Sequence, residues 1–204
     1  FLTEMLNHHN VPMPKSVIVK ASDPDWADNL IATIGLPAVL KVPDGAFSLG
    51  VVKVKDRDTL LQQAEIIFSH SALILAQEFL PTDFDWRIGI LNRQPIFACR
   101  YYMSRGHWQI YQHHQSGRVS SGSFDTLDLK TVPKAVVDAA LKAANLIGDG
   151  FYGVDLKEID GKACIIEVND NPSVDHGVED LFLGDLLYDR IMTEFLRRIQ
   201  LRGF

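Results

Sequence analysis

Residues 153–169 are the most restrictive part of this sequence of 204 residues, because two apolar runs flank the turn-forming pair Asp160-Gly161. Runs rich in Val, Ile and Leu on either side of Asp-Gly predict a β-hairpin. The polar residues Asp155, Glu167 and Asn169 interrupt these runs. A chain that folds this way places an acidic side chain in each of two adjacent strands.

The length of the connecting loop decides whether these polar side chains meet. Side chains alternate along a strand, so Glu167 and Asn169 are expected on one face together with Ile165. A two-residue turn would send Asp155 to the opposite face. A three-residue loop of residues 159–161, ending in a glycine at positive φ, would bring Asp155 to the same face as Glu167. We therefore predict the three-residue loop.

Three oxygen-bearing side chains on one sheet face are unfavourable unless something neutralises them. Mg²⁺ is a hard cation that accepts a few carboxylates and completes its octahedron with water and phosphate oxygens. Asp155, Glu167 and Asn169 are therefore candidate ligands for one Mg²⁺ or two, with Mn²⁺ as a substitute. On these residues alone, a hairpin with one solvated face explains the pattern equally well.

The rest of the chain alternates β-like runs with helical patterns that end at Pro or Gly. Helices are expected at residues 2–9, 23–35, 58–69, 132–148 and 183–199. The β-like runs lie at residues 16–20, 36–42, 51–54, 72–79, 85–91, 94–102 and 107–112. The last three runs predict an antiparallel sheet.

The length and composition limit the kinds of partner. A chain of 204 residues suits one large domain or two small ones, and its net charge of -6 with no long basic run excludes nucleic acid. No apolar run approaches the roughly 20 residues that cross a membrane. Cys99 and Cys164 lie in apolar runs, which favours a reducing, cytoplasmic compartment. Because the chain opens on Phe-Leu-Thr-Glu-Met-Leu without an initiator Met, we expect a fragment or a processed chain.

Lys41 lies in the apolar run 38–42, where an ammonium group needs an anion such as a nucleotide phosphate. A lysine that reaches solvent from a strand end is the alternative. The turn that follows contains Gly45 and Gly50, which allow backbone amides to approach phosphates but are also ordinary turn formers.

The segment of residues 76–87 joins the two halves, and a nucleotide base could pair with its backbone, since ligand sites often form between domains. Arg87 and Arg100 lie on neighbouring β-like runs, where their guanidinium groups could bind phosphate or carboxylate. Surface ion pairs are the alternative for both arginines.

The order of these signals resembles the ATP-grasp superfamily, most closely its RimK-like α-L-glutamate ligase and glutathione-synthetase branch. The signals are a strand lysine, a glycine turn, Gln-Glu-Phe, Asp-x-Arg, Val-Asp and Glu-Val-Asn-x-Asn-Pro. The resemblance implies the ATP-grasp fold, in which two α+β subdomains with mainly antiparallel sheets grip a nucleotide. It implies a small subdomain at residues 1–78, which includes the end of a linker helix at 1–10, and a large subdomain at 79–204. It also implies a preceding N-terminal domain that is absent from this chain.

The resemblance further implies an ATP- and Mg²⁺-dependent ligase that activates a carboxylate as an acyl phosphate for attack by an amine. Its cofactor-binding residues would be Lys41 for the phosphates, Gly45, Ser48 and Gly50 in the turn, Gln77, Glu78, Phe79 and Leu80 for adenine, and Asp85 for ribose or for positioning the next arginine. Its metal ligands would be Asp155, Glu167 and Asn169. Its catalytic residues, near phosphate or substrate carboxylate, would be Arg87, Arg100 and Asn171.

The implied partners are ATP, a carboxylate donor and an amine acceptor, with an amino acid such as glutamate added to a peptide, a protein or a small molecule. A homo-oligomer is also compatible with the resemblance. Two departures are visible: a nucleotide-contacting lysine expected upstream of residue 1 is absent, and residues 107–117 lack an Arg-Ser-Asn pattern. A nucleotide-binding regulatory module without turnover is the alternative function, and a purely structural α+β domain is a third.

Overall fold

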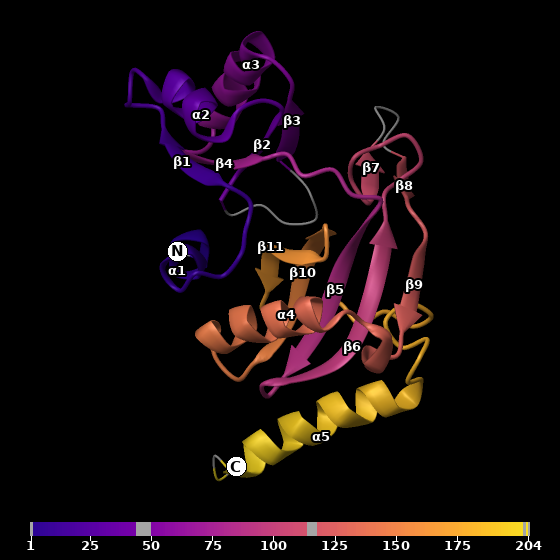
Figure 1. Cartoon of the computed structure of the whole chain (residues 1–204). Helices are drawn as coiled ribbons and strands as arrows, with labels where there is room; N and C mark the ends of the chain where they lie inside the picture. Colours follow the sequence, from indigo (N-terminus) through magenta and orange to yellow (C-terminus); the bar gives the residue numbers. More distant parts are fainter. Residues whose placement is uncertain (1, 44–49, 114–117, 202, 204) are drawn as a thin grey trace. The chain divides into compact units, whose positions relative to one another are not determined.

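The structure of the chain, a computed structural model, describes residues 2–43, 50–113, 118–201 and 203. It divides into two compact units, which we call the small unit (residues 13–81) and the large unit (residues 1–12 and 82–204). Each unit combines an antiparallel sheet with helices, so the predicted α+β class is confirmed (Figure 1).

Helix α1 (Leu2–His8) is part of the large unit, whereas the expected division placed residues 1–78 together. Leu6 of this helix and Val11 after it are buried. Lys142 Nζ, on helix α4 (Lys134–Ile147), donates a hydrogen bond of 3.0 Å to Asn10 O. The chain therefore begins in the large unit and enters the small unit only after Pro12.

The small unit is a four-stranded sheet with two helices packed on one face. Leu40 of the sheet is fully buried together with Leu30 of α2 and Leu60 of α3. Helix α3 begins at a capping box, in which the Thr59 N–H donates to Asp56 Oδ1 at 2.8 Å. The elements are β1 (Ser16–Lys20), α2 (Trp26–Ile34), β2 (Ala38–Lys41), β3 (Val51–Val54), α3 (Arg57–Phe68) and β4 (Leu73–Glu78), and the strand order is β1-β4-β2-β3.

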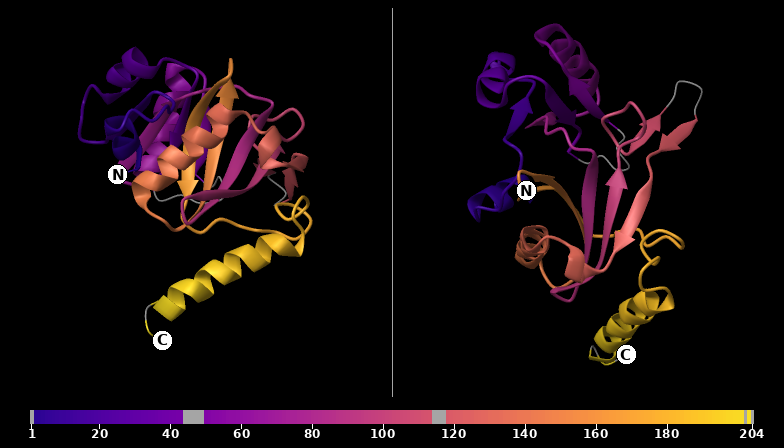
Figure 2. Two further views of the ribbon diagram at one scale, coloured as in Figure 1. Left: turned by 60° about the horizontal axis from the view of Figure 1, so that its bottom comes forward. Right: turned by 45° about the vertical axis from the view of Figure 1, so that its right-hand side comes forward.

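The large unit is built on a five-stranded sheet in the order β11-β10-β5-β6-β9. Helix α4 covers one face with Val136, Ala140, Ala143 and Ala144, all of which are fully buried (Figure 2). The segment that leads into α5 and the first part of α5 cover part of the other face. The elements are β5 (Phe84–Leu91), β6 (Gln94–Tyr102), β7 (Tyr111–His113), β8 (Val119–Ser121), β9 (Phe124–Leu127), the 3₁₀-helix η1 (Leu129–Thr131), α4 (Lys134–Ile147), β10 (Phe151–Ile159), β11 (Lys162–Asn169) and α5 (Asp185–Leu201).

The run at residues 107–112 does not join this sheet, so that part of the antiparallel prediction is wrong. Turns occupy its first residues, where the Ser104 N–H donates to Gln109 O and the His107 N–H donates to Ser104 O. The strand begins only at Tyr111, and it pairs with β8 in a separate two-stranded sheet. The outer strand of the five-stranded sheet is β9, which the sequence pattern did not indicate.

Helix α5 is amphipathic, as its sequence pattern predicts. Leu187 and Ile191 are buried one turn apart, and Arg198 binds Glu194 in the same helix and Asp149 after α4. These contacts attach both ends of the helix to the large unit. Within the described residues, no helix has both the length and the apolar character needed to cross a membrane.

The hairpin β10–β11 corrects the predicted loop. Ile159 pairs with Lys162 across a two-residue turn, in which Asp160 and Gly161 have φ of 51° and 72°. Both values fit a type I′ turn, which follows the twist of the two strands closely. The predicted three-residue loop is therefore wrong.

A β-bulge at Ile166 nevertheless places Asp155 opposite Glu167. Leu156 pairs with Ile165 and Asp155 pairs with Glu167, so Ile166 has no partner of its own in β10. The extra residue breaks the alternation of side chains. Ile165 is 1% exposed opposite the buried Leu156, and Glu167 is exposed on the other face, so the expectation that they share a face is wrong.

The hairpin β5–β6 also contains a two-residue turn and a β-bulge. Leu91 pairs with Gln94 across a two-residue turn, and Gly89 pairs with Phe97 while Ile90 pairs with Pro95. Ile96 is therefore the unpaired residue of a second bulge. Beyond it, Arg87 lies opposite Cys99 and Trp86 lies opposite Arg100.

We predict that Gly161→Ala lowers the free energy of unfolding by about 1 kcal/mol, because a Cβ atom at positive φ crowds the backbone. Among the described residues, nothing lies within 4 Å of the position that this Cβ would take, so the cost is conformational. Urea unfolding followed by circular dichroism measures it. Asp160→Asn is the matched control, and its stability should not change because asparagine suits the same turn. An unchanged stability of Gly161→Ala would contradict the type I′ turn.

Candidate functional site

One face of β10 carries a row of residues with different chemistry. Phe151, Gly153, Asp155 and Lys157 alternate along this face, while Val154 between them is fully buried toward α4. The face is thus apolar at one end and charged at the other. The charged end gathers most of the site residues expected in the large unit.

Asp155 and Arg87 form a two-pronged ion pair across β10 and β5. Arg87 Nε lies 2.7 Å from Asp155 Oδ1, and Arg87 Nη2 lies 2.8 Å from Asp155 Oδ2. The side chains are only 22% and 19% exposed. Burial alone would lower the pKa of Arg87, but the adjacent Asp155 carboxylate raises it above its ordinary value. The guanidinium group is therefore charged and fixed in its plane.

Glu167 and Asn169 place further oxygen-bearing side chains beside Asp155. Asn169 lies opposite Gly153, and its Nδ2 donates to Asp155 Oδ2 at 3.2 Å and to Gly153 O at 3.4 Å. The amide oxygen of Asn169 is thereby left as an acceptor, and each carboxylate oxygen of Asp155 has more than one lone pair. Two carboxylates and an amide oxygen are hard donors that fit Mg²⁺. Among the described residues, no group of three or more His, Cys, Asp and Glu forms a metal cluster.

Asp85 forms a second buried ion pair beside the first. Lys157 Nζ lies 2.6 Å from Asp85 Oδ1 and donates to Thr82 Oγ1 at 2.7 Å. The side chains of Lys157 and Asp85 are 12% and 16% exposed. Burial raises the pKa of Asp85, and the charge of Lys157 partly offsets that effect. Asp85 thus fixes Lys157 in the row that contains Asp155.

Arg100 lies on the opposite face of the sheet from Arg87, because the bulge at Ile96 shifts the pairing of β5 and β6. Its guanidinium group pairs with Asp125 on β9 and lies over the ring of Phe84, at 5.3 Å from the centroid. The structure therefore does not bring Arg100 together with Arg87 and Asp155.

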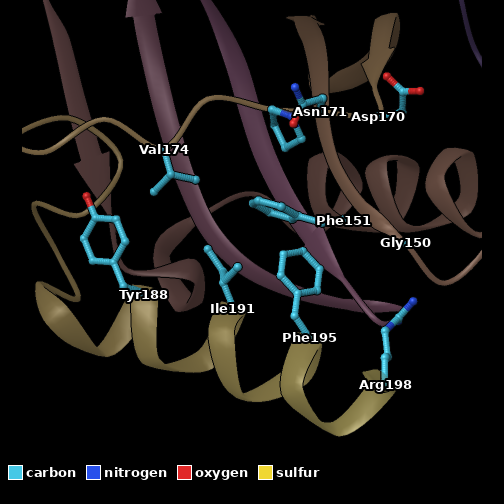
Figure 3. Close-up of a pocket in the computed structure, with 10 residues that line it drawn as sticks. Gly150, Phe151, Asp170, Asn171, Val174, Tyr188, Ile191, Phe195 and Arg198 are labelled. Atoms are coloured by element: carbon cyan, nitrogen blue, oxygen red, sulfur yellow. The ribbon is translucent and has the colours of Figure 1, made fainter. Parts of the chain in front are cut away.

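Asn171 lines a pocket of about 410 Å³ (Figure 3). After β11 the chain crosses β10 at Gly153, between this pocket and Asp155. A Cβ atom on Gly153 would lie 2.8 Å from Pro172, so only glycine permits the crossing. The pocket is lined by Gly150, Phe151, Asp170, Asn171, Pro172, Val174, Tyr188, Ile191, Phe195 and Arg198. Figure 3 shows aromatic and aliphatic side chains from α5 and β10 around its centre, so it is mainly apolar.

In the small unit, Lys41 lies on the sheet face that α2 and α3 leave uncovered. Val39 of the same strand pairs with Lys53 and with Gln77, so these residues share that face with Lys41. Gln77 is buried, and its Nε2 donates to Ser16 Oγ at 3.0 Å. Two lysine side chains and one buried amide thus converge on one sheet face.

The turn after Lys41 is described only at its end. Gly50 has φ of 74°, and a Cβ atom there would lie 3.0 Å from Val42 Cγ2, so glycine is needed at this position. The candidate residues Gly45 and Ser48 lie outside the described residues.

The connector residues expected to hold adenine are partly used by the small unit itself. The Glu78 N–H donates to Lys15 O at 2.9 Å, and the Phe79 N–H donates to Pro37 O at 3.3 Å. Glu78 Oε1 accepts a hydrogen bond of 2.8 Å from the Lys15 N–H. The N–H groups of Glu78 and Phe79 are therefore not available to pair with a base.

Lys53 and Lys157 are candidate site residues that the sequence analysis missed. Lys53 Nζ lies 3.9 Å from the centroid of the Phe79 ring. Lys157 follows Asp155 at the next position on the same face, where it meets Asp85. The available signal was a lysine inside an apolar run, the same signal that identified Lys41.

A family model described as the RimK-like ATP-grasp domain matches residues 2–182. A probable alpha-L-glutamate ligase from Psychromonas ingrahamii is 27% identical over 179 residues, which are 86% of this chain and 55% of that protein. A D-alanine–D-alanine ligase from Desulforudis audaxviator is 26% identical over 174 residues, which are 84% of this chain and 57% of that protein. The chain thus spans little more than half the length of these relatives.

Solved structures share the fold. The D-alanine–D-alanine ligase from Bacillus anthracis matches with a TM-score of 0.78 and 18% identity, over 99% of this chain and 68% of its own. The ATP-grasp ligase PsnB, in complex with minimal precursor, Mg and ADP, matches with a TM-score of 0.67 and 22% identity. The match covers 95% of this chain and 57% of the PsnB chain. The predicted ATP-grasp fold is confirmed. Because the family model covers most of the sequence as well, the chain belongs to the RimK-like ATP-grasp family.

Proposed function

We propose that this chain carries the nucleotide- and metal-binding part of an ATP-dependent, ADP-forming carboxylate–amine ligase. The observation that carries the proposal is the meeting of Asp155, Glu167 and Asn169 on one sheet face, beside the fixed guanidinium group of Arg87. The family and the ligase names of the relatives support it.

Asp155, Glu167 and the amide oxygen of Asn169 would hold Mg²⁺, which supplies positive charge to phosphate oxygens when bound. The bulge at Ile166 supports this assignment, because it turns Glu167 toward Asp155 and away from the apolar core. Because Glu167 is exposed and lies opposite Asp155, it can bind a metal ion without any change in the hydrophobic core.

Arg87 would neutralise an oxygen of the phosphoryl group that is transferred. Asp155 occupies its Nε and Nη2, so the N–H groups of Nη1 lie outside the ion pair. Phosphoryl transfer to a carboxylate brings anions together, so fixed cations and correct positioning supply most of the catalysis. None of these residues needs to act as a nucleophile.

The small unit would bind the nucleotide, with Lys41 and the turn that ends at Gly50 at the phosphates. The residues Gln77 to Leu80 would contact adenine, and the burial of Gln77 and the contact of Lys53 with Phe79 support an ordered surface there. Asp85 would act through Lys157, since this ion pair is buried.

The substrates we propose are a carboxylate donor and an amine acceptor, with an amino acid such as glutamate added to a peptide, a protein or a small molecule. The names of the relatives support an amino acid substrate. We place the reaction in the cytoplasm, where ATP is available and where Cys99 and Cys164 would remain thiols.

The function is tested by measuring ADP release from ATP with Mg²⁺ in the presence of amino acids, alone and paired with peptides, followed by mass spectrometry of the products. A product heavier by one amide-linked residue is expected. ATP binding without ADP release in every combination would favour a regulatory nucleotide-binding module.

We predict that Glu167→Gln weakens Mn²⁺ binding in the presence of ADP by at least about tenfold, because it removes one charged ligand of a hard cation. Titration followed by electron paramagnetic resonance measures free Mn²⁺. The matched control is Glu158→Gln, on the other face of β10, where the amide oxygen can still accept from Trp86 Nε1. Equal Mn²⁺ affinity in both variants would remove Glu167 from the metal site.

We predict that Lys41→Ala lowers the affinity for ATP by about tenfold or more, since a hydrogen bond to a charged group contributes roughly 1.5–3 kcal/mol. Calorimetric titration with a non-hydrolysable ATP analogue measures the affinity. Lys134→Ala, which changes an exposed lysine on α4, should bind the analogue normally. Lys41 has no part in nucleotide binding if its variant matches this control.

A further inference from the structure

We infer that Tyr101 and Glu179 are positioning residues that hold Arg87 in place and tie it to the segment of residues 170–184. The inference rests on the proposed function, because it assigns Arg87 to the transferred phosphoryl group. Neither residue would touch a substrate. Their role would be to fix the guanidinium group from the side that Asp155 leaves open.

Tyr101 lies beneath Arg87 on the same sheet face. Cys99 is the cross-strand partner of Arg87, and Tyr101 is the next residue of β6 on that face. Arg87 Cζ lies 5.3 Å from the centroid of the Tyr101 ring, close enough for a cation–π contact. The ring is 9% exposed, so water screens this contact little.

Glu179 holds the Tyr101 ring at its hydroxyl group. The Tyr101 hydroxyl donates to Glu179 Oε1, and the Asp175 N–H donates to Glu179 Oε2 at 2.7 Å. Burial and this hydrogen bond raise the pKa of Tyr101, so its hydroxyl keeps the proton that it donates. Both carboxylate oxygens therefore have partners, and the Tyr101 hydroxyl cannot leave its position without leaving Glu179 Oε1 unpaired.

The burial of Glu179 is unusual enough to need a reason. It is 1% exposed, and a buried carboxylate is costly unless hydrogen bonds and a cation compensate for lost solvent. The charge of Glu179, at the hydroxyl end of the Tyr101 ring, contributes to the raised pKa of Arg87. The guanidinium group thus binds one carboxylate in its plane and lies near an aromatic ring whose hydroxyl donates to a second carboxylate.

The same contacts fix the segment that follows the metal ligands. This segment begins directly after Asn169, and Thr126 Oγ1 donates to Val178 O at 2.6 Å beside the Glu179 contact. Tyr101 therefore links Arg87 to the backbone of residues 175–179. A loss of the Tyr101 hydroxyl should loosen Arg87 without removing its charge.

The test is a double-mutant cycle between Tyr101→Phe and Arg87→Ala, read by calorimetric binding of AMP-PNP with Mg²⁺. Tyr101→Phe should weaken binding about fivefold in the unmodified chain and less than about twofold in the Arg87→Ala chain, since coupled residues are not additive. Binding of adenosine, which carries no phosphate, should not change. Glu179→Gln should act in the same direction, because it removes the charge but keeps the side-chain volume.

The chain offers a matched control on the opposite face of the sheet. Tyr102 lies beside Arg100, and its hydroxyl lies 3.5 Å from Asp125 Oδ2, so Tyr102→Phe makes the same chemical change next to the other arginine. Tyr102→Phe should bind AMP-PNP normally. Equal effects of Tyr101→Phe with and without Arg87, or equal effects of both tyrosine changes, would overturn the inference. Failure of the unmodified chain to bind AMP-PNP at all would overturn the proposed function and, with it, this inference.

Discussion

The structure of the large unit depends on one extra residue in β11. A type I′ turn pairs Ile159 with Lys162, and in a regular ladder this pairing would put Glu167 on the core side of the sheet. The bulge at Ile166 absorbs one residue, so Ile165 stays in the core against α4 and Glu167 reverses to meet Asp155. In a regular ladder Glu167 would lie opposite Val154, which is fully buried. The bulge in the β10–β11 ladder therefore allows Ile165 to lie in the hydrophobic core and Glu167 to lie on the acidic face.

Ion pairs within the sheet neutralise part of the charge on this face. Asp155 is paired with Arg87 and Asp85 with Lys157, each across β5 and β10. Buried pairs of this kind contribute little net stability, because the loss of hydration offsets most of their attraction. What they provide is a fixed orientation of two cations and two carboxylates. Glu167 adds a third carboxylate to the same face, opposite Asp155.

Much of the fold of the large unit could be predicted from the sequence, because the residue patterns that indicate it are local. The hairpin around Asp160-Gly161, the small residues along α4 and the polar interruptions at Asp155 and Asn169 act within a few positions, although the loop of the hairpin was predicted one residue too long. The bulges could not be predicted, because whether Ile165 or Ile166 is buried is decided by α4, which is distant in sequence. The bulge at Ile96 has the opposite consequence, since it carries Arg100 away from Arg87. Tyr101 and Glu179 gave no signal, because their contact joins residues 78 positions apart.

The crossing at Gly153 explains why the row on β10 changes character so abruptly. After Asn169 the chain passes over Gly153 with Pro172, at a distance that excludes any side chain there. On one side of the crossing lie Asp155 and Lys157, and on the other side Phe151 faces the apolar pocket with Asn171 at its edge. A segment fixed by Glu179 beyond the crossing thus separates an apolar space from a charged one. The positions of Asp155, Asn169 and Arg87 therefore depend on packing on both sides of a single glycine.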